Sequence, residues 1–320
     1  MRTARLWIAF IATVLVILVV LVMLPVAANS LLKDVKVSSG RQLFNVFTGS
    51  PLNLDDMDTT SDEPTYLNIA FTNIDEASRT ATLIVSGHRK CLANCPPLRL
   101  TIFAMGNPEA QRMGLPPSVE ITSDTPGAIS REITLPIAGA PQRYPFDDYR
   151  MTLGLMAELK LPNGTWMPVT ETQIQRSGSI FTLQDQVERL TMDPPIVMDP
   201  SAMYSPGDPF QMLAVDNIYF RRPEHIQIVS VLLVLLITAS GFFALFLRAL
   251  PDVLLGIGGI ILGIWGVRNV VVQGNLPDLT MIDSALSILI LLLLLVVAIR
   301  AARFFWANVH KQPDVPAKEP

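Results

Sequence analysis

Two long stretches without charged residues constrain this sequence more than any other feature. The first runs from Leu6 to Leu32 and the second from Ile226 to Leu247. A helix needs about 20 apolar residues to cross the hydrocarbon core of a bilayer, so both stretches predict membrane-spanning helices. Half of the 320 residues are hydrophobic and only 16% are charged, which is unusual for a chain that folds in water.

Two shorter uncharged stretches follow, at residues 253–267 and 284–299. Each can span a membrane if a nearby charged residue lies at an interface or is paired. The predicted division of the chain is a transmembrane anchor at 1–32, a domain at 33–222, a three-helix transmembrane region at 223–308 and a tail at 309–320.

Positive charges predict the orientation of these helices. With four spans, one side of the membrane receives Arg2, Arg5, Arg248, Arg300, Arg303, Lys311 and Lys318. The positive-inside rule makes this side the cytoplasm, so we expect a multi-pass cell-membrane protein with cytoplasmic termini and an extracytoplasmic 33–222 domain. An alternative for the first stretch is a signal peptide cleaved at Val26-Ala27-Ala28, which leaves three helices and the same outward domain.

Residues 33–222 show the alternation of apolar and polar side chains that is typical of β-strands. Leu67, Ile69 and Phe71, for example, share one face of the predicted strand Tyr66–Ile74. Further strands are predicted to begin near Thr80, Leu98, Val119, Arg131, Met151 and Phe210. Many short strands with proline- and glycine-rich turns, Asn163-Gly164 among them, favour an all-β sandwich such as the immunoglobulin-like fold.

The composition of the 33–222 region argues against several function classes. It carries 22 acidic and 16 basic residues, a net charge of −6, so no nucleic-acid partner is expected. It contains a single histidine, His88, and neither a G-x-S-x-G nor an H-E-x-x-H motif. We therefore expect no enzyme, no catalytic residues and no cofactor.

The two cysteines, Cys91 and Cys95, lie four residues apart between predicted strands. A disulfide that closes this short loop is expected in an oxidising compartment. The alternative is a zinc or copper site with His88 as a third ligand, although a usual site needs a fourth ligand or an open position. Four methionines, Met192, Met198, Met203 and Met212, are expected to fill gaps in a core or interface, although thioethers can bind copper.

Residues 143–150 read RYPFDDYR and lead into a predicted strand. Pro145 fixes a turn, and Phe146 is placed to plug the end of the sandwich. Asp147 can accept backbone N–H bonds or pair with an arginine such as Arg143 or Arg222. Because each part of the motif has an architectural use, we expect a corner of the sandwich.

Tyr144-Pro145-Phe146-Asp147, with Arg221-Arg222-Pro223 before a predicted helix, resembles the extracellular domain of pentameric ligand-gated ion channels. This resemblance implies a channel-like sandwich with the motif at its membrane-facing end. The chain departs from that family in having three helices after the domain instead of four. Its VLLGIGGIILGIWGV helix also lacks the polar stripe of a pore lining.

A wider resemblance is to a family of uncharacterised bacterial and fungal membrane proteins. The chain is similar to them in its N-terminal helix, its Y-P-F-D-x-Y segment ending at Tyr149, and its Arg268-Asn269 dipeptide followed by a loop with Pro277. The resemblance implies the same order of an N-terminal helix, a YPFD-containing β domain and a C-terminal helical bundle. It implies no activity.

Arg268 and Asp283 flank the loop between the last two predicted helices. Ionisable residues at membrane depth need a partner, so we expect them to form an ion pair, with an ion or proton relay as the alternative. The expected function is that of a non-enzymatic accessory, scaffold or binding subunit. Its expected partners are the lipid bilayer and either another protein or further copies of itself. The alternative is a divergent oligomeric receptor related to ligand-gated channels.

Overall fold

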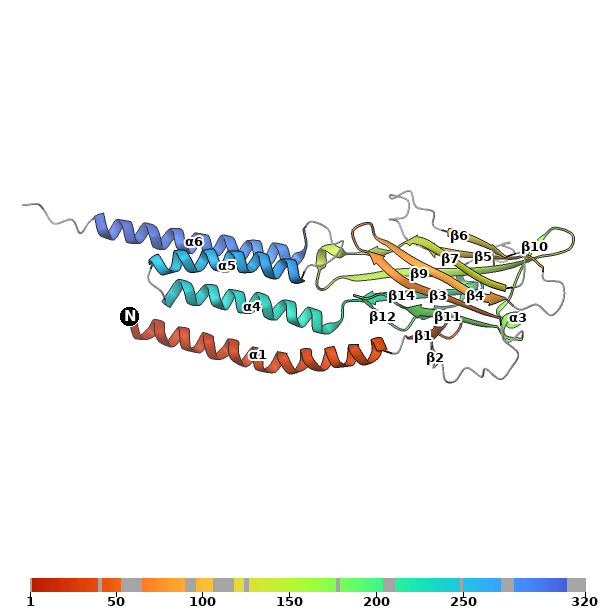
Figure 1. Ribbon diagram of the computed structural model, residues 1–320, viewed down its shortest axis with the longest axis horizontal. Coiled ribbons are helices and arrows are strands. Elements are labelled where there is room, and N and C mark those ends of the chain that lie inside the picture. The colour runs from red at the N-terminus through yellow and green to blue at the C-terminus, as the bar shows by residue number, and fades with distance from the viewer. Residues whose placement is uncertain are drawn as a thin grey trace, which may run out of the picture. The chain divides into compact units, whose positions relative to one another are not determined.

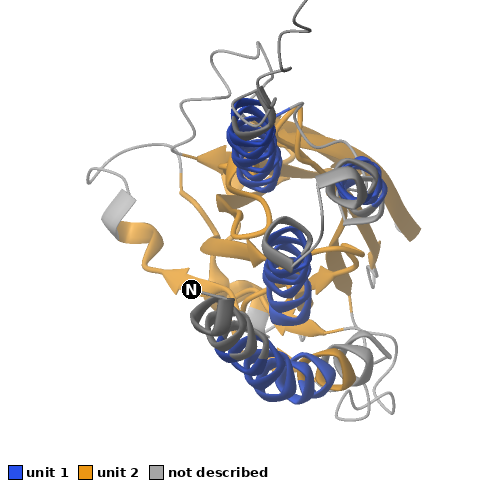
Figure 2. Ribbon diagram, turned by 90° about the vertical axis from the view of Figure 1, so that its left-hand side faces the viewer, with its two compact units in different colours: residues 1–29, 224–274, 278–320 blue, residues 30–223, 275–277 orange. Residues whose placement is uncertain are grey.

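The computed structural model of the protein describes residues 2–39, 42–52, 65–89, 96–105, 118–123, 127–176, 179–203, 211–247, 250–271 and 279–309. The chain divides into two compact units, which Figure 2 shows in different colours. One unit consists of residues 1–29, 224–274 and 278–320, and the other of residues 30–223 and 275–277. We describe each unit separately.

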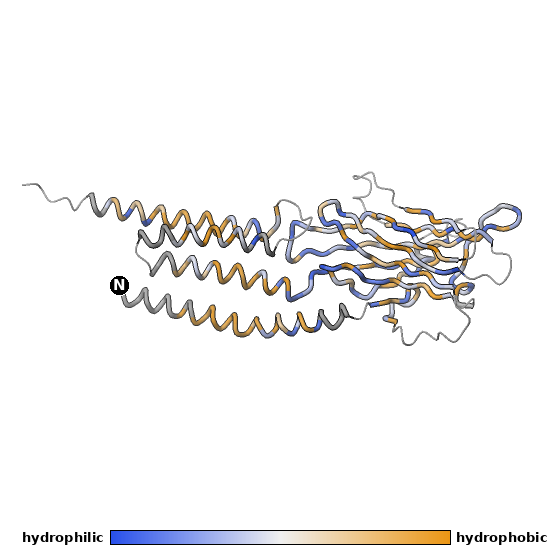
Figure 3. The backbone as a smooth tube through the Cα atoms, in the orientation of Figure 1, coloured by the Kyte–Doolittle hydropathy of each residue, from blue (hydrophilic) through white to orange (hydrophobic). Residues whose placement is uncertain are grey.

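Long helices make up the first unit. They are α1 (Arg2–Ser39), which continues into the second unit, α4 (Glu224–Leu247), α5 (Leu250–Val271) and α6 (Met281–Val309). Three of them contain a stretch long and apolar enough to cross a membrane, at Val14–Lys33, Glu224–Phe243 and Met281–Trp306. Figure 3 shows the hydrophobic residues along these helices. In α5 the corresponding stretch is shorter, at Gly256–Gly266.

Side chains from α5 and α6 form a small apolar core, whose buried members are Ile257, Leu293 and Val297. Gly241 of α4 lies against Leu293, because a Cβ atom at position 241 would stand 2.7 Å from a Leu293 methyl carbon. Other large apolar side chains, such as Leu262 and Leu291, remain exposed. Exposed apolar surface on long helices is suited to lipid or to a protein partner.

Two β-sheets make up the second unit (Figure 1). The six-stranded sheet has the order β2-β1-β11-β3-β4-β7. Its strands are β1 (Leu43–Asn45), β2 (Pro51–Leu52), β3 (Tyr66–Asp75), β4 (Thr80–Arg89), β7 (Gly127–Pro136) and β11 (Ile180–Asp185). All its pairings are antiparallel except that of β11 with β3, which is parallel.

The eight-stranded sheet is built around β9, the longest strand. Its main order is β12-β14-β9-β5-β6, with β8 and β10 also paired to β9 and β13 paired to β14. The strands are β5 (Leu98–Met105), β6 (Ser118–Ser123), β8 (Ala138–Gly139), β9 (Asp148–Lys160), β10 (Trp166–Pro168), β12 (Thr191–Met192), β13 (Ile196–Met198) and β14 (Ala214–Arg221). Short helical segments accompany them, at η2 (Pro141–Arg143), α3 (Glu171–Arg176) and η3 (Pro200–Met203).

One apolar core joins the two sheets. Phe71 and Leu83 from the six-stranded sheet and Leu155 and Phe220 from the other sheet are members, and the Phe71 and Phe220 rings meet edge to face with centroids 5.1 Å apart. Alternate residues along long strands such as β4, where Ala81, Leu83 and Val85 are members, point into this core, as the sequence pattern predicted. A large β-rich domain accompanied by apolar helices is therefore confirmed.

The strands predicted from alternation are present, and the Asn163-Gly164 turn joins β9 to β10. Gly164 has φ +87°, a conformation that favours glycine, and the Asn163 side chain accepts hydrogen bonds from the amide and hydroxyl of Thr165. The sequence did not predict β11 or its parallel pairing with β3. The segment 180–185 is short, and no turn signal typical of a hairpin precedes it.

Candidate functional site

Residues 141–147 form a tight corner before β9. The Tyr144–Pro145 peptide bond is cis, and the Phe146 amide donates a hydrogen bond to the Arg143 carbonyl over 2.9 Å. The corner turns Asp147 inward and leaves Phe146 45% exposed. Phe146 therefore does not plug the end of the sandwich as expected.

Tyr149, two residues after Asp147, is the aromatic residue of the motif that lies in the apolar core. It is a member of the apolar core and has no exposed surface. Its ring lies directly against Gly139 of β8, where an added Cβ atom would overlap the ring. Burial, and then the negative charge of Asp147, raises the pKa of the Tyr149 hydroxyl above its ordinary value.

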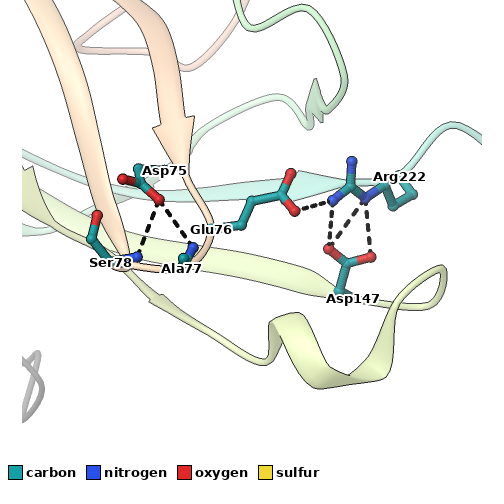
Figure 4. A network of polar contacts seen from close by, with 6 residues as sticks. All are labelled: Asp75, Glu76, Ala77, Ser78, Asp147 and Arg222. Carbon is teal, nitrogen blue, oxygen red and sulfur yellow. Dashed lines mark hydrogen bonds and ion pairs between the residues drawn. The ribbon is translucent and has the colours of Figure 1, made fainter. Parts of the chain in front are cut away.

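The inward-facing Asp147 binds Arg222 in a two-pronged ion pair (Figure 4). Arg222 Nε lies 3.0 Å from Asp147 Oδ1, and Nη2 lies 3.0 Å from Oδ2. The Arg222 guanidinium also lies 4.8 Å from the centre of the Tyr144 ring. Of the two arginines that the sequence offered to Asp147, Arg222 is the partner, and Pro223 alone separates it from the first residue of α4.

A second carboxylate, Glu76, completes the cluster by placing Oε2 2.5 Å from Arg222 Nη2. The turn between β3 and β4 presents Glu76, because Asp75 Oδ1 accepts hydrogen bonds from the amides of Ala77 and Ser78 (Figure 4). Arg79 closes the turn with φ +53°. Short polar side chains that bind nearby amides are typical of such turns.

We call Glu76, Asp147 and Arg222 the base network. It joins three segments that are distant in sequence: the β3–β4 turn, the corner before β9 and the end of β14. The Asp147 side chain has no exposed surface and that of Arg222 only 2%. Geometry and burial of this kind make an ion pair a specific structural link.

The base network contains two carboxylates on one guanidinium. Burial raises the pKa of the Glu76 carboxyl above its ordinary value, although the Arg222 charge acts in the opposite direction. Burial alone would lower the pKa of Arg222, but the hydrogen bonds and charges of Asp147 and Glu76 together raise it. The guanidinium therefore keeps its charge, and its donors are directed at carboxylates within the domain.

Arg221, the other arginine of the predicted motif, lies outside the base network. Its side chain is 67% exposed and forms an ion pair with Asp193, at 2.7 Å between Nη2 and Oδ2. Successive residues of a strand point to opposite faces. Arg221 ends β14 on its outward face, and Arg222, the next residue, turns inward.

Arg268 and Asp283 meet in the helical unit, with Arg268 Nε 2.6 Å from Asp283 Oδ1. Asp283 Oδ2 accepts two further hydrogen bonds, from the amide and hydroxyl of Thr280. Thr280 precedes α6, so this arrangement resembles a capping box that satisfies the first amides of the helix. Asp283 thus caps α6 and links it to α5.

Both the predicted disulfide and the alternative metal site involve Cys91 and Cys95, which lie outside the described residues. His88 lies on β4, opposite Tyr66 of β3 and Ala128 of β7. Within the described part of the chain, no group of three His, Cys, Asp or Glu side chains is arranged to hold a metal ion.

Sequence reasoning overlooked Glu76 and Asp216 among the buried acidic residues. Glu76 lies in a polar turn, and nothing in the local pattern shows that this turn faces Arg222. Asp216 lies on β14 with Ala214 and Ile218 on the same inward face, and it is 1% exposed. Burial raises the pKa of Asp216 to about 7.

Comparison of the chain with models of known protein families gives no match, and comparison with curated proteins gives none either.

Proposed function

We propose that this protein is a non-enzymatic, multi-pass membrane protein whose β domain is an outward-facing accessory, scaffold or binding module. The observation that carries this proposal is the base network. Its charges are buried and paired with one another, so they hold the domain's own segments together instead of facing a substrate. Only Pro223 separates Arg222 from the first residue of α4, so the network fixes the end of the domain just before the chain continues into an apolar helix.

The proposed location is the cell membrane, with both termini in the cytoplasm and the β domain outside. It is supported by the three helices that are long and apolar enough to cross a bilayer and by the cations near their ends. Protease added to intact cells should cleave within the β domain and spare a tag at the C-terminus. Cleavage of the tag with protection of the domain would reverse this orientation.

The experiment that tests the accessory function is the mass of the complex after gentle solubilisation, with its co-purifying proteins identified. We expect a fixed ratio of this chain to a second protein. A monomer that co-purifies with nothing, at several detergent concentrations, would contradict a subunit role.

The alternative function is that of an oligomeric receptor with a channel-like sandwich. The corner at Tyr144–Asp147 and its ion pair with Arg222, next to the first helix after the domain, favour it. This function requires a closed ring of copies, and in the pentameric channels that the motif resembles the ring has five members. A monomeric or dimeric mass would exclude it, whereas five identical chains would exclude the accessory role.

A further inference from the structure

The outer face of the eight-stranded sheet carries an unusual group of sulfur atoms. Leu153 and Leu155 of β9 point into the apolar core, so Thr152, Gly154 and Met156 point to the opposite face. Met105 at the end of β5 and Met198 at the end of β13 share that face by register, through Thr152 and Val215 respectively. Thioethers from separate strands therefore gather on one surface.

Gly154 is the centre of this arrangement. A Cβ atom built on Gly154 would lie 2.8 Å from Met105 Sδ and 3.4 Å from Met212 Sδ. Both sulfurs thus lie near one point above the sheet and are no farther apart than these two distances combined. An added Cβ atom at this point would crowd both sulfurs, so glycine leaves this space open to them.

Met198 is held on the same face by polar contacts. Its sulfur lies 3.0 Å from Asn217 Nδ2, and Asn217 Oδ1 in turn accepts a hydrogen bond from Thr152 Oγ1 at 2.7 Å. Thr152 is the cross-strand neighbour of both Met105 and Asn217. The hydrogen bonds orient a sulfur lone pair and fix the Met198 side chain on the face that carries the Met105–Met212 pair.

We propose that Met105, Met198 and Met212 form a binding site for a soft monovalent metal ion, Cu(I) or its analogue Ag(I). Thioethers are soft ligands that select Cu(I) over harder divalent ions. They carry no charge, so an ion of charge +1 is easier to accommodate among them than one of charge +2.

The fit of an ion requires only small side-chain movements. At metal–sulfur bonds of about 2.3 Å, two sulfur ligands lie up to about 4.6 Å apart. Methionine has three rotatable side-chain bonds, so its sulfur can move over this range without a change in the backbone. Unlike cysteine or histidine, a thioether has no proton to lose, so the affinity is expected to be the same from pH 6 to pH 8.

The test uses the full-length protein in detergent with Cys91→Ser and Cys95→Ser, which removes the thiols that would compete for the ion. Cu(I) is supplied under reducing conditions in competition with a chromophoric chelator, and Ag(I) serves as a probe that does not change oxidation state. We expect one ion per chain. The double variant Met105→Leu/Met212→Leu should bind at least about 10- to 100-fold more weakly.

Two further variants make the result specific. Met167→Leu removes an exposed methionine on β10 and should leave the affinity unchanged. Gly154→Ala keeps every sulfur but fills the point between them, so it should also weaken binding at least tenfold. Leucine replaces methionine at similar volume, and matching thermal unfolding curves will show that the variants fold. No retained ion, or equal affinity in the double variant or in Gly154→Ala, would overturn the proposal.

Discussion

Two of the places where arginine meets carboxylate, the base network and the Arg268–Asp283 pair, differ in how far the surrounding structure depends on the arginine. In the base network two carboxylates share Arg222, and the side chains are almost fully buried. In the helical unit Arg268 meets one carboxylate and is 30% exposed, and Thr280 supplies Asp283 with further donors. Removal of the cation should therefore be costly in the first cluster and mild in the second.

The sharpest test of this difference is Arg222→Met. Loss of the guanidinium leaves Asp147 and Glu76 buried without a cation, and we expect the β domain to lose about 3–5 kcal/mol of stability. Hydrogen exchange of peptides from β9 and β14 in the solubilised chain will measure it. Arg221→Met is the matched control, because the exposed ion pair with Asp193 should contribute under about 1 kcal/mol. Equal losses of stability in the two variants would show that the base network stabilises the domain no more than an exposed ion pair does.

Asp216 extends the comparison to a buried carboxyl for which the described residues supply no hydrogen bond to Oδ1. Its pKa is raised to about 7 from an ordinary value of 3.8, so the folded domain holds the proton more tightly than the unfolded chain. The stability that this group confers is complete below about pH 4 and is lost as the pH rises through about 7.

Stability of the β domain should therefore fall by about 2–3 kcal/mol between pH 5 and pH 8. In Asp216→Asn this fall should be much smaller, because the amide does not titrate. Denaturant unfolding at the two pH values will measure both proteins. The same pH dependence in the variant would assign the effect to another group.

The two carboxylates of the base network should not be equivalent. Asp147→Asn breaks the two-pronged ion pair, and we expect a loss of about 2 kcal/mol. Glu76→Gln should cost less than about 1 kcal/mol, because it removes the carboxylate that burial already disfavours in its charged form. Unfolding measured at pH 7 will rank them. A larger loss from Glu76→Gln would mean that Glu76 is the principal partner of Arg222.

The smallest effect is expected from Arg268→Met in the helical unit. Asp283 keeps the amide and hydroxyl of Thr280, so the start of α6 should lose only about 1 kcal/mol. Amide exchange at residues 280–284 will detect this change. Asp283→Ala removes the cap itself and should have the greater effect, and the reverse order would show that the ion pair matters more than the cap.

Much of the fold could be predicted because local patterns determine it. The alternation in Tyr66–Asp75 and in β9 identified strands, and uncharged length identified helices. The pairing of Asp147 with an arginine was also accessible, since few cations lie near a domain end. The expectation that Phe146 plugs the end of the sandwich was wrong, because the motif alone does not reveal that the corner turns Asp147 and Tyr149 inward.

Features that depend on distant residues could not be predicted. Glu76 lies in a turn whose sequence is typical of solvent-exposed loops, and only the folded chain brings it to Arg222. The methionines around Gly154 come from segments far apart in sequence, Met105 from β5 and Met212 from the residues before β14, and their convergence depends on the strand register. Asp216 interrupts an otherwise apolar alternation. The alternation identifies the strand, but it does not show that the Asp216 carboxyl is buried.

The parallel pairing of β11 with β3 has a consequence for the order of events during synthesis. Phe181 stands beside Leu67 in the sheet, so more than a hundred residues must be made before β3 acquires this neighbour. Contacts at such sequence separation slow folding and leave strand edges open in the meantime. Arg222 arrives later still, immediately before α4. The residue that closes the base network is therefore among the last of the β domain to be synthesised, and the nascent domain is completed only as the ribosome begins the next helix.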